Sequence, residues 1–275
     1  MKTMSDSTLN TRTSTQEITK ALELQGRVIA AIILRETKSR YGDHSLGFLW
    51  VLIEPILFIV GFAVLHGLMG AKEHHGMSPE LFMLTGLLPY MMFRNVLSQA
   101  SGAIQGNSAL LAFPQVTTFD LILARSILEF CTAIAVFAVL VFALVFFGHE
   151  VRIERPLAFF AGYCLNFGMG MGLGAVLAAV SPYFPSVKQI SGVLFGRPLF
   201  FTSGVFFTAG QLPESVRNIL MYNPLLHVTE WSRSSFFASF ESEFIDYGYM
   251  TLFCLILLSA GLAFHSVLQK KALGR

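Results

Sequence analysis

Six long apolar runs restrict the folds open to this chain more than any other feature of its sequence. They cover Phe48–Met69, Leu81–Leu97, Ser126–Phe147, Leu157–Val180, Ile190–Phe207 and Gly248–His265. A helix needs about 20 apolar residues to cross the roughly 30 Å hydrocarbon core of a bilayer. The composition agrees with that solvent, because 54% of the residues are hydrophobic and only 13% are charged. We therefore expect an all-α membrane protein with six transmembrane helices.

The distribution of positive charge predicts how these helices are oriented. With a cytoplasmic N-terminus, thirteen of the 19 Lys and Arg residues fall on the inner side and five on the outer side. Because short cytoplasmic loops are enriched in Lys and Arg, we expect both termini in the cytoplasm. The first thirty residues lack the apolar core of a signal peptide, so we expect none to be removed. Cys131, Cys164 and Cys254 fall inside predicted spans, which argues against a disulfide framework or a metal site.

The segment before the first span is typical of an amphipathic helix. We expect residues 1–13 to form a disordered tail and residues 14–47 to form a cytoplasmic interface helix, with Ser14 and Glu17 at capping-box spacing. Apolar residues then recur at helical intervals, at Ile18, Leu22, Ile29, Ile32 and Ile33. Lys and Arg occupy other positions, so such a helix would lie along the inner membrane surface. A helix that packs on its own bundle is the alternative.

Two segments between spans are too long for tight turns. Residues 98–125 are predicted to be cytoplasmic, are broken by Pro114, and are expected to contact another protein. Residues 208–247 are predicted to lie on the outer side and contain two short apolar pieces, VRNILMYNPLLHVTEW and SSFFASF. Neither piece is long enough to span a bilayer at about 1.5 Å per residue. We expect re-entrant or interfacial helices there, before the last span.

Four glycines alternate in the fourth predicted span, at Gly168, Gly170, Gly172 and Gly174. A glycine-rich phosphate loop would follow a strand and open a helix, whereas these residues lie within an apolar run. We interpret them as two overlaid GxxxG faces, on which neighbouring helix backbones approach closely.

Two ionisable residues enter the predicted spans, and each is followed by proline. Glu54 precedes Pro55, and Arg197 precedes Pro198. At about 1.5 Å per residue, both lie roughly 9 to 10 Å inside the cytoplasmic edge of their spans. An unpaired charge at that depth is costly, so we predict that the two side chains reach each other or the same water-filled path. A purely structural ion pair is the alternative.

Residue patterns of enzymes are scarce in this chain. No G-x-x-x-x-G-K-[ST] motif occurs, so ATP binding by that loop is excluded, and the KEHHG stretch lacks HExxH spacing. The acids of the last outer segment are typical of a solvated face: Glu214, Glu230, Glu241, Glu243 and Asp246. Trp50, Tyr90, Tyr183 and Trp231 near span ends fit an interfacial aromatic belt, although aromatic faces would also suit sugar rings moving along a wide path.

Three stretches of the sequence resemble a known family. They are LRETKSRYGDHSLGFLWVLIEPIL from Leu34, NSALLAFPQVTTFDLILARSILE from Asn107 and YNPLLHVTEWSRSSFF from Tyr222. From Thr19 to Lys271 the chain resembles the membrane subunit of type-2 ABC exporters, and most closely the permease of Gram-negative capsular polysaccharide export. The resemblance implies a homodimeric permease of the bacterial inner membrane, without a catalytic site or cofactor of its own. Two copies of a separate cytoplasmic ATPase would bind ATP and magnesium and drive export of a lipid-linked, acidic polysaccharide.

The same resemblance implies roles for particular residues. Residues 48–275 would form the six-span domain, with a coupling loop at 98–125 and a periplasmic gate at 208–247. The substrate pathway would include Arg35, Lys38, Arg40, Trp50, Glu54, Tyr90, Arg94 and Arg197. The loop that couples to the ATPase would use Asn107, Phe113, Pro114, Asp120 and Arg125. The gate would use Asn223, Pro224, His227, Glu230, Trp231 and Arg233.

Further partners and several alternatives follow from the resemblance. It implies a periplasmic partner like the polysaccharide co-polymerases, an outer-membrane exporter and surrounding lipids, and no nucleic acid. O-antigen and teichoic-acid exporters are close relatives, and a drug or small-lipid exporter is a further alternative. A membrane enzyme that acts on lipid-linked glycans, served by the outer acids and His227, is the alternative from another class.

Overall fold

The computed structural model describes residues 3–41, 46–69, 77–184 and 186–273, and the regular elements in those ranges are helices. The long ones are α1 (Thr3–Tyr41), α2 (Leu46–Leu68), α3 (Pro79–Ser101), α5 (Thr118–Phe146), α6 (Pro156–Val180) and α11 (Tyr247–Leu273). The short ones are α4 (Ala103–Gly106), η1 (Ser108–Ala112), α7 (Ser186–Leu194), α8 (Arg197–Thr202), η2 (Ala209–Gln211), α9 (Glu214–Leu220) and α10 (Pro224–Phe236). The predicted all-α class is confirmed for this part of the chain.

Within the described residues, five helices are long and apolar enough to cross a bilayer. They are Leu49–Leu68, Pro79–Ser101, Thr118–Phe146, Pro156–Val180 and Tyr247–His265. These five coincide with the first, second, third, fourth and sixth of the predicted spans.

The run Ile190–Phe207, expected to form the remaining span, is divided between α7 and α8. Pro198 explains the division, because proline has no N–H to bond the carbonyl four residues back and its ring collides with that carbonyl. The residue four positions back is Leu194, at which α7 ends. The backbone then turns at Gly196, where φ is −85° and ψ is −115°. The expected single spanning helix is therefore a pair of shorter ones.

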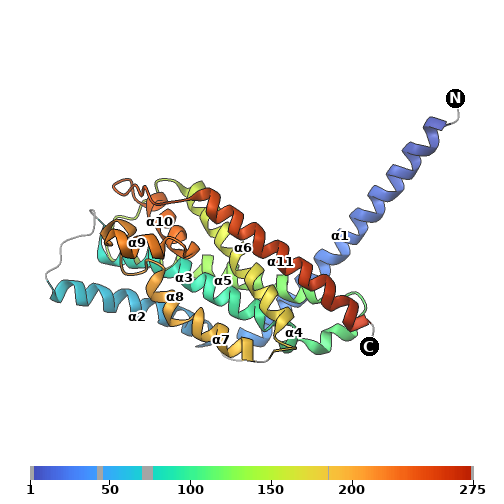
Figure 1. The fold of residues 1–275 in the computed structure, drawn as a ribbon, viewed down its shortest axis with the longest axis horizontal. Helices are drawn as coiled ribbons and strands as arrows, with labels where there is room; N and C mark the ends of the chain where they lie inside the picture. The colour runs from blue at the N-terminus through green and yellow to red at the C-terminus, as the bar shows by residue number, and fades with distance from the viewer. Residues whose placement is uncertain (1–2, 42–45, 70–76, 185, 274–275) are drawn as a thin grey trace.

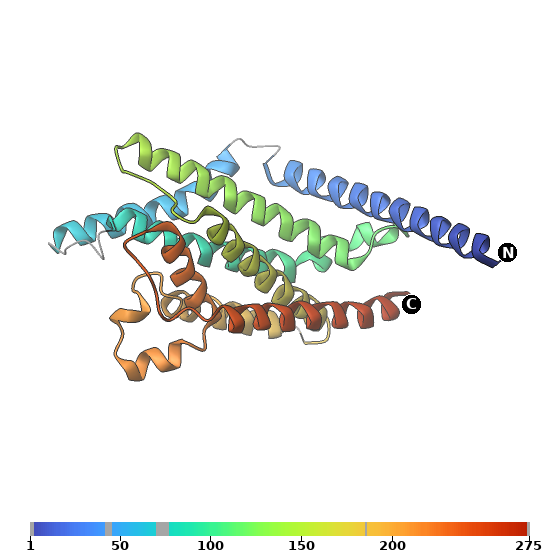
Figure 2. The same ribbon diagram turned by 90° about the horizontal axis from the view of Figure 1, so that it is seen from above.

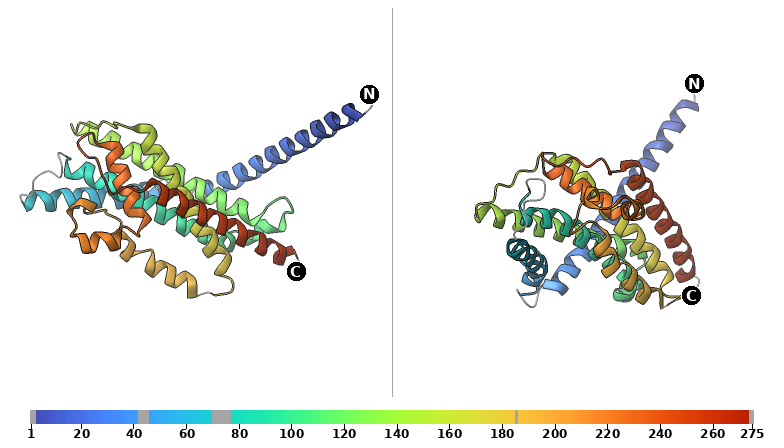
Figure 3. Two further views of the ribbon diagram at one scale, coloured as in Figure 1. Left: turned by 45° about the horizontal axis from the view of Figure 1, so that its top comes forward. Right: turned by 60° about the vertical axis from the view of Figure 1, so that its left-hand side comes forward.

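Helices α3 and α6 form the centre of the bundle. Helix α3 packs against α2, α5, α6 and α10, and α6 packs against α11 on its other side. Among the five long apolar helices, α3 is the most buried, and α2 and α11 are the least. Figures 1 and 3 show α9 and α10 at one end of the bundle, and α4 and the C-terminus at the other.

The alternating glycines of α6 face two different neighbours, as the two overlaid GxxxG faces predict. A Cβ added to Gly168 would lie 2.7 Å from Cys254 Sγ, and one added to Gly172 would lie 2.7 Å from the backbone of Leu257 on α11. The other two glycines face α3: a Cβ on Gly170 would lie 3.2 Å from Val96, and one on Gly174 would collide with Ala100. Since glycine has no side chain, both neighbours can approach the α6 backbone closely.

Helix α1 includes residues that were expected to be disordered, and its C-terminal half packs on the bundle, which was the alternative to a helix lying along the membrane surface. It begins at Thr3, so the described part of the expected disordered tail is helical. Figures 1 and 2 show its N-terminal half extending away from the bundle and its C-terminal half running beside α5. Ile32 of that second half is buried with Leu121 and Ile122 of α5. The C-terminal half of α1 therefore packs on its own bundle.

Candidate functional site

A groove runs between α2, α3 and the α7–α8 pair. Its wider part has a volume of about 400 Å³ and is lined by Glu54, Arg94 and Arg197 together with the rings of Phe58, Tyr90, Phe200 and Phe201. An adjoining space of about 300 Å³ is lined by Ser98, Ser101 and Ser191. Arg94 and Gly196 border both spaces, so the two form one continuous depression, which we name the Arg94 groove.

Glu54 and Arg197 both border the Arg94 groove, but the ion pair of Glu54 is with a different arginine. Its carboxylate lies 3.0 Å from Arg94 Nη2. The Arg197 side chain has no hydrogen bond or ion pair with any residue in the described parts of the chain. Glu54 and Arg197 therefore reach one groove without pairing, because α2 packs mainly against α3, which carries Arg94.

Aromatic side chains form one wall of the groove. The hydroxyl of Tyr90 donates to Gly196 O at 3.1 Å, at the break between α7 and α8. The Tyr90 ring is 5.0 Å from that of Phe200, which in turn lies 5.5 Å from Phe58. Tyr90 is therefore a buried wall residue and not part of an interfacial belt. Trp50, by contrast, is exposed and lies outside this lining.

The basic residues of α1 are used differently from expectation. Arg35 bonds the side chain of Asn107, and Arg40 pairs with Glu129 of α5. These contacts hold α1 to the bundle and leave neither guanidinium in the Arg94 groove. Lys38 is exposed. Arg40 borders a separate space of about 220 Å³, and the role of Arg35 and Arg40 in a substrate pathway stays a prediction.

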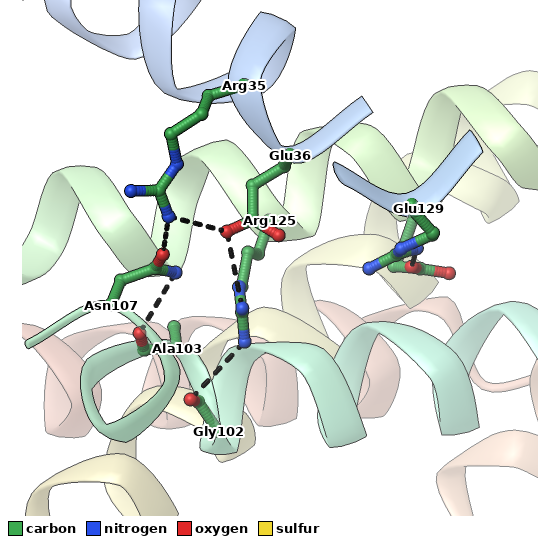
Figure 4. A network of polar contacts seen from close by, with 8 residues as sticks. Arg35, Glu36, Gly102, Ala103, Asn107, Arg125 and Glu129 are labelled. Atoms are coloured by element: carbon green, nitrogen blue, oxygen red, sulfur yellow. Dashed lines mark hydrogen bonds and ion pairs between the residues drawn. The ribbon is translucent and has the colours of Figure 1, made fainter. Parts of the chain in front are cut away.

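Glu36 is the centre of a polar network that joins α1 to α4 and α5. It accepts from Arg35 at 3.4 Å and from Arg125 at 3.2 Å, and Arg125 also donates to Gly102 O at 3.3 Å (Figure 4). Burial alone would raise the pKa of the Glu36 carboxyl, but the hydrogen bond from Asn107 and the charge of Arg125 outweigh it and lower the pKa below its usual value. Glu36 is therefore ionised at neutral pH and ties the two arginines together.

The residues expected to couple to an ATPase divide into an interior group and an exposed tip. Asp120 is fully buried, closes a capping box with Thr117 at the start of α5, and accepts a hydrogen bond from Gln25 of α1. Asn107 and Arg125 belong to the interior network described above. Phe113 and Pro114 are exposed. Only this tip, at the end of η1, is placed to contact a partner directly.

Helix α10 carries a buried arginine that fixes the chain after α8. Arg233 donates to Phe207 O at 2.9 Å and to Val205 O at 3.0 Å, and its guanidinium lies 3.9 Å from the centre of the Phe82 ring. Burial lowers the pKa of Arg233 to about 10, although the charge of Glu230 opposes the shift. Arg233 therefore stays charged at neutral pH and holds the segment from Val205 to Phe207 against α3.

Glu230 was expected on a solvated face, and that expectation is wrong. Its side chain is buried and accepts from Ala209 N at 2.9 Å and from Ser242 Oγ at 2.5 Å. The acid faces inward because two donors from flanking loops need an acceptor at that position. Glu241 does lie at the surface, where it pairs with Arg155 at 2.8 Å.

The other expected gate residues also make structural contacts. Asn223 caps α10 by accepting from Leu225 N at 3.0 Å and also donates to Thr202 Oγ1 at 3.1 Å, and Pro224 occupies the first turn. His227 lies 2.8 Å from Met221 O and accepts from Asp246 N at 3.2 Å. The Trp231 ring lies over Gly162, 4.8 Å from Tyr247. Together these contacts make the region between α8 and α11 a packed unit.

Sequence reasoning missed several residues of these sites. Gln25, Glu36 and Glu129 join α1 to α5, and Phe58 and Phe200 line the groove. A signal was present for the first group, since positions 25, 29, 32, 36 and 40 of α1 fall on one helical stripe. The KEHHG stretch, considered above as a metal site, lies outside the described residues, and no cluster of three metal-ligating side chains occurs within them.

Comparison with known proteins places the chain in a family. Residues 27–237 match the family described as ABC-2 type transporter, which is more than half of the sequence. The chain belongs to the ABC-2 type transporter family. The matched range of the ABC-2 family covers the α1–α5 network, the Arg94 groove and α10, and it ends before α11.

Two ABC-2 relatives are similar over nearly the whole chain. The polysialic acid transport protein KpsM of Escherichia coli is 30% identical over 254 residues, which cover 91% of this chain and 97% of that protein. The capsule polysaccharide export inner-membrane protein CtrC of Neisseria meningitidis serogroup B is 33% identical over 256 residues, which cover 91% and 94%. The O-antigen export system permease protein RfbA of Klebsiella pneumoniae is more distant, at 19% identity over 249 residues.

Proposed function

We propose that this chain is the membrane permease of a bacterial exporter of capsular polysaccharide and that it works in the inner membrane. The observation that carries the proposal is the similarity along nearly the whole chain to a polysialic acid transport protein and a capsule polysaccharide export protein. Identity to the O-antigen permease is much lower. The Arg94 groove supports the proposal, because aromatic rings suit sugar rings and an excess of positive charge suits an acidic chain.

We propose that two copies face each other and together enclose a pathway that includes the Arg94 groove. We propose such a homodimer, with both termini in the cytoplasm and with α7 and α8 together making the fifth crossing. A helix broken beside a transport site is common in membrane transporters. Helices α9 and α10 would be the re-entrant gate on the periplasmic side, which agrees with their place at the bundle end opposite α4 (Figure 1). A periplasmic co-polymerase-like partner and an outer-membrane exporter would receive the chain there.

Energy would come from two copies of a separate ATPase that bind ATP and magnesium. We propose that the tip formed by Phe113 and Pro114 seats against that subunit, since these residues are exposed at the end of η1. The buried network around Glu36 would then carry a displacement of the tip to α1 and α5. Asn107, Asp120 and Arg125 would act in this transmission and not at the docking surface.

Export in cells tests the proposal. The chain and its ATPase are expressed in a capsule-negative strain that lacks its own permease, and surface polysaccharide is quantified. Phe113→Ala should lower export at least about tenfold and reduce the amount of ATPase that co-purifies, because a central aromatic anchor of the interface is lost. The matched control is Phe147→Ala, an exposed phenylalanine at the other end of α5, which should export normally.

The ATPase arm of the same experiment separates transport from enzymatic function. Changing the catalytic glutamate of the ATPase should abolish export although the permease is unaltered. Export that survives this change, or action of the purified chain alone on a lipid-linked glycan, would contradict the proposal. The glycan found on the surface also distinguishes a capsule exporter from an O-antigen or teichoic-acid exporter.

A further inference from the structure

The Arg94 groove contains more positive than negative charge. Among the residues that the structure describes, the acidic and basic side chains that line it are Glu54, Arg94 and Arg197, which leaves one positive charge in excess. The Arg197 side chain is exposed to the groove and, among the residues that the structure describes, has no hydrogen-bond or ion-pair partner. A guanidinium at membrane depth requires an anion, a polar group or water close by. Thus no acidic side chain among the described residues of the chain neutralises the charge of Arg197.

The Glu54–Arg94 pair has a geometry that a second anion can enter. Both carboxylate oxygens of Glu54 contact the same nitrogen, Arg94 Nη2, at 3.0 and 3.1 Å. A bidentate pair would use two guanidinium nitrogens, one for each oxygen. Arg94 Nε is directed to Asn95 Oδ1 at 3.4 Å, and the centre of the guanidinium lies 6.0 Å from the centre of the Tyr90 ring. The side chains of Glu54 and Arg94 are 42% and 35% exposed, so an incoming group can reach both.

We propose that Glu54 is the resident counter-ion of an anion-binding site, from which a carboxylate or phosphate group of the transported molecule displaces it. Arg197 binds the incoming anion first, because no acidic side chain has to leave its guanidinium beforehand. Arg94 then exchanges its contact with Glu54 for a bidentate contact with the same anion. This inference rests on the proposed function and goes further, since it states what makes the groove selective: a neutral glycan lacks the group that competes with Glu54.

The exchange has a mechanical consequence, because the pair joins two helices. Glu54 belongs to α2 and Arg94 to α3, and α2 is the least buried of the five long apolar helices. Displacing Glu54 removes a polar link between α2 and the centre of the bundle. Arrival of an anionic group would therefore loosen the wall of the groove at the place where the group binds.

Binding to the permease–ATPase complex in phosphatidylcholine nanodiscs tests the inference. Titration calorimetry compares trigalacturonate, which carries a carboxylate on each sugar, with neutral maltotriose. Glu54→Gln should tighten trigalacturonate binding about five- to tenfold at low salt, because a competing negative charge is removed. Arg197→Gln should weaken it by at least about the same factor, and Arg197→Lys should weaken it less. Maltotriose affinity should not change, and salt at about 0.5 M should reduce the differences.

Matched controls lie outside the groove. Glu80→Gln removes an acid at the start of α3, and Arg152→Gln removes an exposed arginine between α5 and α6, so neither should alter trigalacturonate binding. A second set of nanodiscs, containing phosphatidylglycerol, identifies the source of the anion. Competition between this lipid and trigalacturonate assigns the site to a lipid phosphate, and absence of competition assigns it to the sugar carboxylate.

Two results would overturn the inference. One is a Glu54→Gln complex that binds trigalacturonate no more tightly than the native complex. The other is one that loses affinity as Arg197→Gln does, because Glu54 would then only position Arg94. If Glu54→Gln does not fold, Glu54→Asp shortens the carboxylate and should tighten binding by a smaller factor, and an unchanged affinity counts against the inference. A native complex that fails to export contradicts the proposed function, whereas unchanged affinities in a complex that exports contradict this inference alone.

Discussion

Replacing Gly172 by alanine should separate α6 from α11 and destabilise the fold. An added Cβ would lie 2.7 Å from the carbonyl carbon of Leu257 and 2.8 Å from the nitrogen of Leu258. Ordinary van der Waals contact is at 3.4–4 Å, so the two backbones must move apart by about 0.5 to 1 Å. Overpacking of this kind costs about 1 to 3 kcal/mol. The higher helix propensity of alanine offsets about 1 kcal/mol, which leaves a net loss of up to about 2 kcal/mol.

A denaturant titration in detergent micelles measures this loss against a matched substitution. Gly61 lies in α2, and a Cβ added there would meet nothing within 4 Å. Gly61→Ala should therefore keep the propensity gain of up to about 1 kcal/mol. The free energies of unfolding of the two variants should differ by about 1 to 3 kcal/mol, with Gly172→Ala the less stable.

A second glycine of the same helix sharpens the test. The Cβ of Gly168→Ala would meet Cys254 Sγ, which is the end of a side chain, so Cys254→Ala should restore part of the lost stability. No truncation of Leu257 or Leu258 should restore Gly172→Ala, because the clash there is with backbone atoms. Rescue by Leu258→Ala, or equal stability of Gly172→Ala and Gly61→Ala, would refute the argument that the two backbones are in contact.

Two further substitutions test the buried polar groups. Glu36→Gln should destabilise the protein by about 2 kcal/mol at neutral pH. Because the pKa of Glu36 is lowered in the fold, its contribution is present above its usual value of 4.5 and lost as the pH falls below it. Thermal unfolding of both forms from pH 7 downward should therefore converge, and a constant gap would contradict the assignment. Arg233→Lys should expose residues 205–207 to proteolysis, since lysine cannot hold both carbonyls and the Phe82 ring; an unchanged digest would count against it.

Much of the helical architecture could be predicted because it depends on local properties. Five spans follow from apolar runs that are long enough to cross a bilayer. The two faces of α6 follow from the spacing of Gly168 to Gly174, since positions two apart on a helix point in clearly different directions. The division of α7 from α8 could also have been read from Pro198, whose effect on Leu194 is purely local.

The polar contacts could not be predicted, because their partners are distant in sequence. Asp120 was assigned to an interface with another protein, yet it is buried under Gln25, 95 residues earlier. Arg40 was assigned to a substrate pathway, yet its partner is Glu129, 89 residues later. The sequence around an arginine does not show whether its side chain is free to bind a ligand or is paired with an acid on another helix. Deciding between the two requires the packing of α1 on α5.

Glu54 shows that the position of a residue in a membrane sequence predicts its depth but not its neighbours. Counting about 1.5 Å per residue from the end of a span gives its depth, and depth alone left Arg197 as the expected partner. The rotation of each helix about its axis is set by contacts with a neighbouring helix. An example is the contact of Gly170 and Gly174 in α6 with α3. That rotation directs Arg94 to Glu54 and leaves Arg197 unpaired among the described residues on the same groove. A membrane sequence therefore predicts at which level its charges lie, and the packing of its small residues decides which of them meet.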